Sequence, residues 1–362
     1  MKGLDIVISH FLPQGGVEEV RPLGNGLIND TYIVKTAGLG HDYVLQRINN
    51  AIFKNVGLLQ SNIEAVTAHL REKELAAGTP DIDRHVLRFI SGADGKTFFH
   101  DGESYWRMMV FIPGSKSYES VTPEYSRIAG QAFGRFQAML CDLPQRLGET
   151  IPDFHNMELR LRQLRDAVAA DPVGRAADVA GILADIERRA DAMCFAERLH
   201  RKGVLPKRVC HCDTKVNNML FDSSTGEVLC VIDLDTVMPS YIFSDVGDFL
   251  RTAANTVAED DPALEKVEFR MDIFKEFMAG YLDSAGVFLT SKELELLPEG
   301  AAMFPYMQAV RFLADYINGD TYYKTSYPEH NLVRTRNQMR LLECIEAVIP
   351  QMREYIKGIM PS

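Results

Sequence analysis

The chain has 362 residues, of which 46% are hydrophobic and 25% are charged, as in ordinary globular proteins. This length is enough for two lobes with separate cores. The formal net charge of −11 argues against a nucleic acid as the partner, because nucleic acids are bound by basic surfaces. No apolar run approaches the ~20 residues of a membrane span, and no secretory signal is visible at the start of the sequence. The six cysteines are scattered, as in a reducing compartment, so we expect a cytoplasmic protein without a membrane partner.

The first 112 residues alternate in the manner of a small antiparallel sheet. Residues 1–19 fit a short helix and a loop, and residues 52–74 carry apolar side chains at helical spacing. Several short strand-like runs, separated by turn sequences, surround this second helix. They cover residues 20–23, 32–34, 43–48, 86–90, 97–99 and 106–112. We expect a five-stranded antiparallel lobe over residues 1–112.

From residue 113 onward the apolar spacing is mainly helical. Thr122 and Pro123 mark a helix start, because threonine caps a helix and proline fits its first turn. Two more helices are expected within residues 156–202, and residues 264–358 should be mainly helical. The whole pattern predicts an α+β protein of two lobes, with the larger, mainly helical lobe over residues 113–362 and the active site in the cleft.

The most informative stretch has the form His-x-Asp-x-x-x-x-Asn, with His211, Asp213 and Asn218 at the fixed positions. In phosphoryl transfer to an alcohol, one aspartate accepts the hydroxyl proton, while an asparagine and a second aspartate hold Mg²⁺. We therefore predict Asp213 as the catalytic base, and Lys215 as a residue that holds the γ-phosphate or steadies the base. His211 is expected to brace the loop. A surface loop with solvated acids is the alternative, and the length of the pattern argues against it.

The metal ligands are predicted from a β-hairpin that follows this loop. Two apolar runs, 219–221 and 228–232, flank the turn sequence 222–227. Antiparallel pairing of these runs would return Asp233 to a position beside Asn218, at the open end of the hairpin. Two oxygen ligands for one hard cation would then meet without any long-range coincidence.

Two neighbouring features allow more than one interpretation. Asp235 has three possible roles. It is a second metal ligand, an acid that supports the direct ligands from behind, or the residue that replaces part of an Asp-Phe-Gly motif. The triplet Cys210-His211-Cys212 suggests zinc, but structural zinc usually needs two to four residues between paired cysteines. We therefore expect Cys210 and Cys212 to be small buried thiols.

Several segments resemble the aminoglycoside phosphotransferase and choline kinase-like superfamily, which shares the protein kinase fold. Within it, the chain looks most similar to the N-acetylhexosamine 1-kinases. The segments are GNGLINDTY (24–32), YVLQRIN (43–49), VTAHL (66–70), HCDTKVNNMLF (211–221) and RFLADY (311–316). The resemblance spans roughly residues 20 to 340 and implies ATP- and Mg²⁺-dependent phosphorylation of the anomeric hydroxyl of an N-acetylhexosamine. It also implies that Asp245 braces the backbone of the catalytic loop.

In a kinase-like fold the small lobe holds the nucleotide. The turn Gly24-Asn25-Gly26 lies between two strands, at the place of a phosphate-binding loop, and Asn29-Asp30-Thr31 could close on the phosphates. A plain hairpin turn is the alternative. The backbone of Phe111 and Ile112, at the hinge between the lobes, is expected to bind adenine.

One strand of the small lobe carries the expected phosphate ligand. Protein kinases have a lysine here, whereas this chain has Gln46 and Arg47. Only one of the two can face the cleft, because successive strand residues point to opposite faces. We favour Arg47 because it is the only cation on the strand, with Glu64 as its candidate partner.

The acceptor is expected to bind near Arg311, Asp315 and Tyr322, with its hydroxyl at Asp213. A sugar is recognised by paired hydrogen-bonding groups and an aromatic face, and this cluster offers both. An ordinary ion pair between Arg311 and Asp315, four residues apart on one helix, is the alternative.

Other questions stay open at this stage. Asp248 and Arg251 are further candidates for the substrate side. The acceptor could instead be an aminoglycoside, choline, homoserine or methylthioribose. A pseudokinase is the alternative from another class, although such proteins usually lose the base or a metal ligand. The protein could be a monomer or a homodimer.

Overall fold

The structure is a computed structural model and describes residues 2–24, 28–119 and 121–360. The chain forms two compact units. The first unit comprises Met1–Ser117, Asp142–Pro152 and Met219–Met238. The second comprises Tyr118–Cys141, Asp153–Asn218 and Pro239–Ser362. The first unit thus extends past the boundary expected at residue 112, and it includes the hairpin that follows the catalytic loop.

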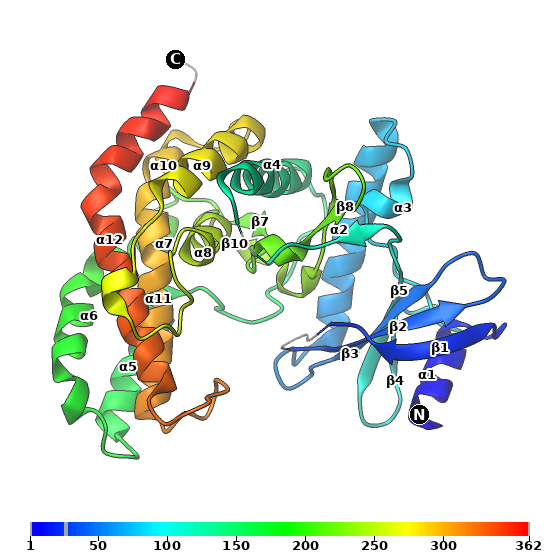
Figure 1. The fold of residues 1–362 in the computed structure, drawn as a ribbon, viewed down its shortest axis with the longest axis horizontal. Coiled ribbons are helices and arrows are strands. Elements are labelled where there is room, and N and C mark those ends of the chain that lie inside the picture. The colour runs from blue at the N-terminus through cyan, green and yellow to red at the C-terminus, as the bar shows by residue number, and fades with distance from the viewer. Residues whose placement is uncertain (1, 25–27, 120, 361–362) are drawn as a thin grey trace. The chain divides into compact units, whose positions relative to one another are not determined.

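A five-stranded antiparallel sheet forms the centre of the first unit, in the order β1-β2-β3-β5-β4 (Figure 1). The strands are β1 (Val17–Pro22), β2 (Asp30–Thr36), β3 (Tyr43–Ile48), β4 (Phe98–His100) and β5 (Tyr105–Val110). Helix α1 (Lys2–Phe11) contributes Val7 and Phe11 to a core shared with Val34, Leu45 and Met108. The prediction of a five-stranded antiparallel sheet is confirmed.

The predicted strand at residues 86–90 does not form as a regular strand. Short helix α3 (Ile82–His85) precedes it, and its only ladder contact is an isolated bridge between Phe89 and Met109. Residues 86–90 approach the same edge of β5 as β4 does. Because β4 already pairs with residues 105–107 of β5, residues 86–90 can reach only the end of that strand.

The predicted helix at residues 52–74 is α2 (Val56–Ala76). Asn55 caps it, because its side-chain oxygen accepts a hydrogen bond from the Leu58 amide at 3.0 Å. The buried Asn62 side chain donates to the carbonyls of Gly148 at 2.8 Å and Val237 at 3.1 Å. These bonds tie the two later segments of the first unit to this helix.

The hairpin expected after the catalytic loop is present as β8 (Met219–Asp222) and β9 (Val228–Val231), with β6 (Ser115–Lys116) beside β8. The pairing is antiparallel, and Met219 lies opposite Val231. The Asp222 carboxylate accepts the amides of Ser224 and Thr225 at 2.8 and 2.9 Å and so shapes the turn. The prediction of a hairpin over these two runs is therefore confirmed.

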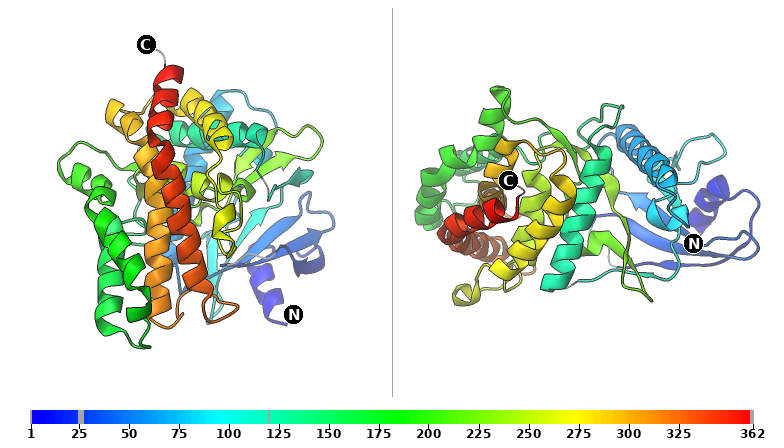
Figure 2. Two further views of the ribbon diagram at one scale, coloured as in Figure 1. Left: turned by 60° about the vertical axis from the view of Figure 1, so that its left-hand side comes forward. Right: turned by 90° about the horizontal axis from the view of Figure 1, so that it is seen from above.

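The second unit is mainly helical (Figures 1 and 2). Helix α11 lies at its centre, packs against α5, α6 and α8, and runs beside α12. Its helices are α4 (Pro123–Leu140), α5 (Met157–Ala170), α6 (Ala180–Met193), α7 (Phe195–Arg201), α8 (Phe243–Ala253), α9 (Met271–Ala285), α10 (Ser291–Glu295), α11 (Leu297–Ile317) and α12 (His330–Ile359). The short strand β7 (Arg208–Cys210) leads into the catalytic loop, and β10 (Met238–Ser240) lies between the hairpin and α8.

Helices α4 and α9 approach each other closely because of small residues. A Cβ atom added at Gly130 would lie 2.2 Å from the Phe277 carbonyl oxygen, so only glycine fits there. The start of α4 is as predicted, since the Thr122 side chain accepts a hydrogen bond from the Tyr125 amide at 3.2 Å.

The sheet and this helical unit confirm the predicted α+β fold class. Among the described residues, no helix is both long and apolar enough to cross a bilayer.

Candidate active site

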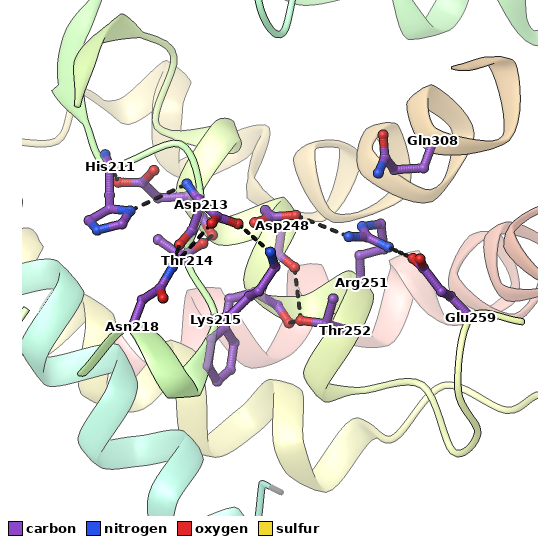
Figure 3. Close-up of polar contacts among 12 residues, drawn as sticks. His211, Asp213, Thr214, Lys215, Asn218, Asp248, Arg251, Thr252, Glu259 and Gln308 are labelled. Carbon is purple, nitrogen blue, oxygen red and sulfur yellow. Dashed lines mark hydrogen bonds and ion pairs between the residues drawn. The ribbon is translucent and has the colours of Figure 1, made fainter. Parts of the chain in front are cut away.

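The predicted base, Asp213, is held by two neighbours in the loop after β7 (Figure 3). Lys215 Nζ lies 2.7 Å from Asp213 Oδ1. The Asn218 side-chain amide donates to Asp213 Oδ2 at 3.2 Å and to the Asp213 carbonyl at 2.7 Å. Because both bonds use the Asn218 nitrogen, the amide oxygen of Asn218 is left as an acceptor. The structure thus brings together the predicted base, its lysine and one predicted metal ligand.

Asp245, on α8, holds the backbone of this loop. Its carboxylate accepts the amides of His211 at 2.9 Å and Cys212 at 2.7 Å, and the Gln137 side chain at 2.6 Å. Burial raises the pKa of Asp245, and these donors oppose the rise. Cys212 has a φ of 64°, a left-handed conformation that costs energy for a residue other than glycine. The Asp245 contacts stabilise that strained turn next to Asp213.

The His211 ring is buried within the second unit. It packs edge-on against Phe133 and Phe136, with ring centroids 5.8 and 5.9 Å apart. Its Nδ1 accepts the Asp213 amide at 3.3 Å. These contacts suit the bracing role expected from the sequence better than a role in proton transfer.

A second layer of charges lies behind Lys215 (Figure 3). Burial opposes the charge on Lys215, but Asp213 and Asp248 raise its pKa above the ordinary value, so it stays protonated. Burial raises the pKa of Asp248 to about 6. Arg251 lies 3.4 Å from Asp248 and 2.6 Å from Glu259. Asp248 and Arg251 thus continue the charge network that begins at the base.

The thiols near the loop have no features of a zinc site. Cys210 and Cys212 are buried, and burial raises the pKa of both thiols. Among the described residues, no group of three or more His, Cys, Asp or Glu side chains is placed to hold a metal ion. This finding does not test the predicted magnesium site, because its two expected ligands are one asparagine and one aspartate.

In the first unit, a buried chain of polar contacts joins five residues: Thr31, Gln46, Arg107, Asp235 and Asn29. Gln46 donates to Thr31 at 3.2 Å and accepts two bonds from Arg107 at 2.9 and 2.8 Å. Arg107 Nη1 lies 2.5 Å from Asp235 Oδ1, and both side chains are almost fully buried. Asn29 donates to Asp235 Oδ2 at 2.7 Å. Asp235 thus has a hydrogen bond at Oδ2 and an ion pair, without a hydrogen bond, at Oδ1, and both contacts argue against its role as a metal ligand.

Sequence reasoning missed Arg107. The signal was an arginine within the apolar strand Trp106-Arg107-Met108-Met109, because a buried arginine needs a partner. Gln46 lies directly opposite it in the register of β3 and β5. Of the two candidates on β3, it is Gln46 that joins the buried network.

The expected pairing of Arg47 with Glu64 is wrong. Arg47 is half-exposed and binds Asp30 opposite it in the sheet, with Nε 2.7 Å from Asp30 Oδ2. Glu64 instead accepts a hydrogen bond from Thr97. The register explains this outcome, since Asp30 and Arg47 are cross-strand neighbours.

The remaining nucleotide-binding candidates that the structure describes are Gly24, Phe111 and Ile112. Gly24 has a φ of 70°, which glycine adopts without strain. Asn25 and Gly26 fall outside the described residues. Phe111 donates its amide to the Asp42 carbonyl at 2.9 Å, and the Ile112 carbonyl accepts the Ser115 hydroxyl at 2.7 Å.

Asp233 follows the hairpin and begins a short 3-10 turn (Leu234–Thr236). Its φ of 59° is left-handed, a conformation that aspartate adopts more readily than most other residues with a side chain. One residue, Ile232, separates it from Val231, whose partner Met219 directly follows Asn218.

On the expected acceptor side, Arg311 and Asp315 do not form an ion pair. Arg311 Nη1 donates to Gln308 at 2.8 Å, and its guanidinium carbon lies 6.0 Å from the Tyr322 ring centroid. The buried Asp315 carboxylate accepts the amides of Thr321, Tyr322 and Tyr323 at 2.8 to 3.0 Å. It also accepts the Asn331 side chain at 2.9 Å. These contacts leave Asp315 no free oxygen lone pair toward solvent, whereas the Tyr322 side chain is exposed.

Solved structures share this fold. The aminoglycoside phosphotransferase of Alicyclobacillus acidocaldarius is 13% identical, with a TM-score of 0.61 over 98% of this chain and 96% of that chain. The choline kinase of Cryptosporidium parvum is 13% identical, with a TM-score of 0.57 over 100% of this chain and 98% of that one. The spectinomycin phosphotransferase APH(9)-Ia, solved with ADP and spectinomycin, is 13% identical, with a TM-score of 0.53 over 98% of both chains. The fold is therefore the kinase-like fold predicted from the sequence.

Residues 19–280 match the phosphotransferase enzyme family, APH. This segment is more than half of the chain, so the chain belongs to that family. The predicted class of enzyme, a phosphotransferase of the small-molecule kinase type, is confirmed. Family membership alone does not select the acceptor.

Proposed function

We propose that the protein is an ATP-dependent kinase that phosphorylates the anomeric hydroxyl of an N-acetylhexosamine and releases the sugar 1-phosphate. The observation that carries the kinase proposal is the placement of Asp213 between Lys215 and Asn218. The acceptor proposal rests on the sequence resemblance to N-acetylhexosamine 1-kinases and on the arginine beside two tyrosines, Tyr322 and Tyr323.

Asp213 accepts the proton of the acceptor hydroxyl as the new P–O bond forms. Lys215 fixes one carboxylate oxygen and Asn218 the other, so the base is oriented before the acceptor arrives. The charge of Asp213 raises the pKa of Lys215 against the effect of burial, so the lysine stays protonated. Positioning and charge neutralisation supply most of the acceleration in reactions of this type.

Magnesium would be held by Asn218 and Asp233. The side-chain nitrogen of Asn218 is used by Asp213, so its oxygen is the atom available to a cation. Asp233 brings a carboxylate on a backbone held in a left-handed conformation. When bound, Mg²⁺ neutralises charge on the phosphates of ATP. Asp235 is better suited to support Arg107, because both its oxygens have protein partners.

The nucleotide would lie on the first unit. Gly24 and the residues after it could close on the phosphates, where the buried network adds the cation Arg107 beside Thr31 and Gln46. Arg107 replaces Arg47 as our candidate cation for the phosphate region, since Arg47 is half-exposed and bound to Asp30 on the neighbouring strand. At the hinge, Phe111 already uses its amide, which favours Ile112 as the backbone donor to adenine.

The test is ATP consumption with Mg²⁺ against N-acetylglucosamine, N-acetylgalactosamine, free hexoses, aminoglycosides, choline and homoserine. We expect turnover with an N-acetylhexosamine and phosphate on C1 by NMR. Turnover only with another acceptor would contradict the sugar proposal and leave the kinase class intact. ATP that fails to bind in the presence of Mg²⁺ would contradict the kinase mechanism itself.

Asp315 is expected to act by positioning the tyrosine loop, not by touching the sugar. In Asp315→Asn, one oxygen acceptor becomes an NH₂ donor that faces backbone amides, which costs about 1–3 kcal/mol of local stability. We expect the KM for the acceptor to rise about tenfold, while kcat and the KM for ATP change little. A lowered melting temperature with an unchanged acceptor KM would show that Asp315 is only structural.

A further inference from the structure

A cluster of four residues in the second unit lies near Phe154 and the side chain of Arg311. We call it the arginine cluster, and it consists of Arg160, Arg311, His155 and Tyr323. The guanidinium carbon of Arg311 lies 5.6 Å from the ring centroids of both Phe154 and Tyr323. Arg160 Nη2 donates to the Phe154 carbonyl at 2.5 Å, and the His155 ring stacks on the Phe154 ring with centroids 4.3 Å apart.

Neither arginine of this cluster forms an ion pair among the described residues, although the charge of Asp153 attracts Arg160 at longer range. Arg251, by contrast, pairs with Asp248 and Glu259. Burial and the charge of Arg311 lower the pKa of Arg160 to about 10, which still leaves it charged at neutral pH. Burial and the nearby arginines hold the pKa of His155 well below its ordinary value, so its ring is neutral. Two cations without an ion pair therefore lie together in a chain with a net charge of −11.

Three buried polar atoms in the cluster lack a hydrogen-bond partner. They are Arg160 Nε, His155 Nδ1 and the Tyr323 hydroxyl. Buried polar atoms almost always have partners, so a group of three calls for a ligand or water. Arg160 Nε and the Tyr323 hydroxyl are donors, and the complementary ligand atom is an oxygen acceptor without a proton of its own.

We propose that Arg160, together with Arg311, determines which amino sugar the enzyme accepts, by repelling an acceptor with a free ammonium group and favouring one whose nitrogen is acylated. This inference rests on the proposed function and narrows its substrate class. The carbonyl oxygen of an acyl group would accept hydrogen bonds from the unpartnered donors. An ammonium group would meet two like charges that no ion pair offsets, and repulsion of this kind is an effective means of specificity.

The experiment compares kcat/KM for N-acetylglucosamine with kcat/KM for glucosamine. We expect the wild-type enzyme to favour N-acetylglucosamine, and Arg160→Gln to reduce this preference at least about tenfold, in part through faster glucosamine turnover. Arg160→Lys keeps the charge and should keep most of the preference. Arg162→Gln is the matched control, because Arg162 is an exposed arginine on the same helix and should leave the ratio unchanged.

The ratio separates specificity from a general loss of structure, since damage to the fold lowers turnover of both sugars alike. If Arg160→Gln does not fold, the pH dependence of the wild-type ratio serves instead. Raising the pH converts the glucosamine ammonium to the neutral amine, so kcat/KM for glucosamine should rise relative to kcat/KM for N-acetylglucosamine. An unchanged ratio in Arg160→Gln, or across that pH range, would overturn the inference while sugar turnover upholds the proposed function. No turnover of either sugar would overturn both.

Discussion

The Asp213→Asn variant is expected to lose about 100- to 10,000-fold in kcat, the usual contribution of a general base. An amide cannot accept the proton of the acceptor hydroxyl. It can still accept hydrogen bonds through its oxygen, so contacts with Lys215 and Asn218 would be partly kept. The measurement is ATP consumption at saturating acceptor and nucleotide.

Nucleotide binding separates this effect from misfolding. Calorimetry in Mg²⁺ should give an ATP affinity within about threefold of the wild type, because the base acts on the hydroxyl and not on the nucleotide. Asp191→Asn is the matched control, since Asp191 is an exposed carboxylate in the same unit. A kcat within about tenfold of the wild type for Asp213→Asn would mean that Asp213 is not the base.

The features predictable from the sequence are the local ones. The eight-residue pattern around Asp213 places base, lysine and asparagine within one loop, and the structure keeps them in contact. The hairpin was equally local, because two short apolar runs with a turn between them have few ways to pair. The five-stranded sheet follows from the same alternation of side chains.

Contacts between distant segments were not predictable. Nothing near Arg107 in the sequence indicates that its partner is Asp235, because β5 and the turn after β9 meet only in the folded unit. The contacts of Asp315 were not predictable for a related reason. Spacing on one helix offered Arg311 as an ion-pair partner, the alternative to substrate binding, but the amides of the loop after α11 need an acceptor, and the buried carboxylate satisfies three of them.

The two aspartates of Ile-Asp-x-Asp are expected to respond differently to substitution. Asp233→Ala should weaken Mg²⁺-dependent ATP binding by more than about 100-fold, because loss of a direct metal ligand exceeds the 10- to 100-fold effect of outer partners. The measurement is calorimetry of ATP binding with Mg²⁺ and with a chelator. In the variant, the two titrations should become nearly equal.

Asp235→Asn provides the contrast. Asp235 neutralises the buried Arg107, so its loss should lower the free energy of unfolding by about 3 kcal/mol. Magnesium should still strengthen ATP binding in this variant, measured below its melting temperature, because the ligands Asn218 and Asp233 are intact. The opposite pattern, with metal dependence lost in Asp235→Asn and kept in Asp233→Ala, would reverse the roles that the contacts of the two carboxylates support. Loss of metal dependence in both variants would make the pair a joint metal site and would require Asp235 to leave Arg107 when Mg²⁺ binds.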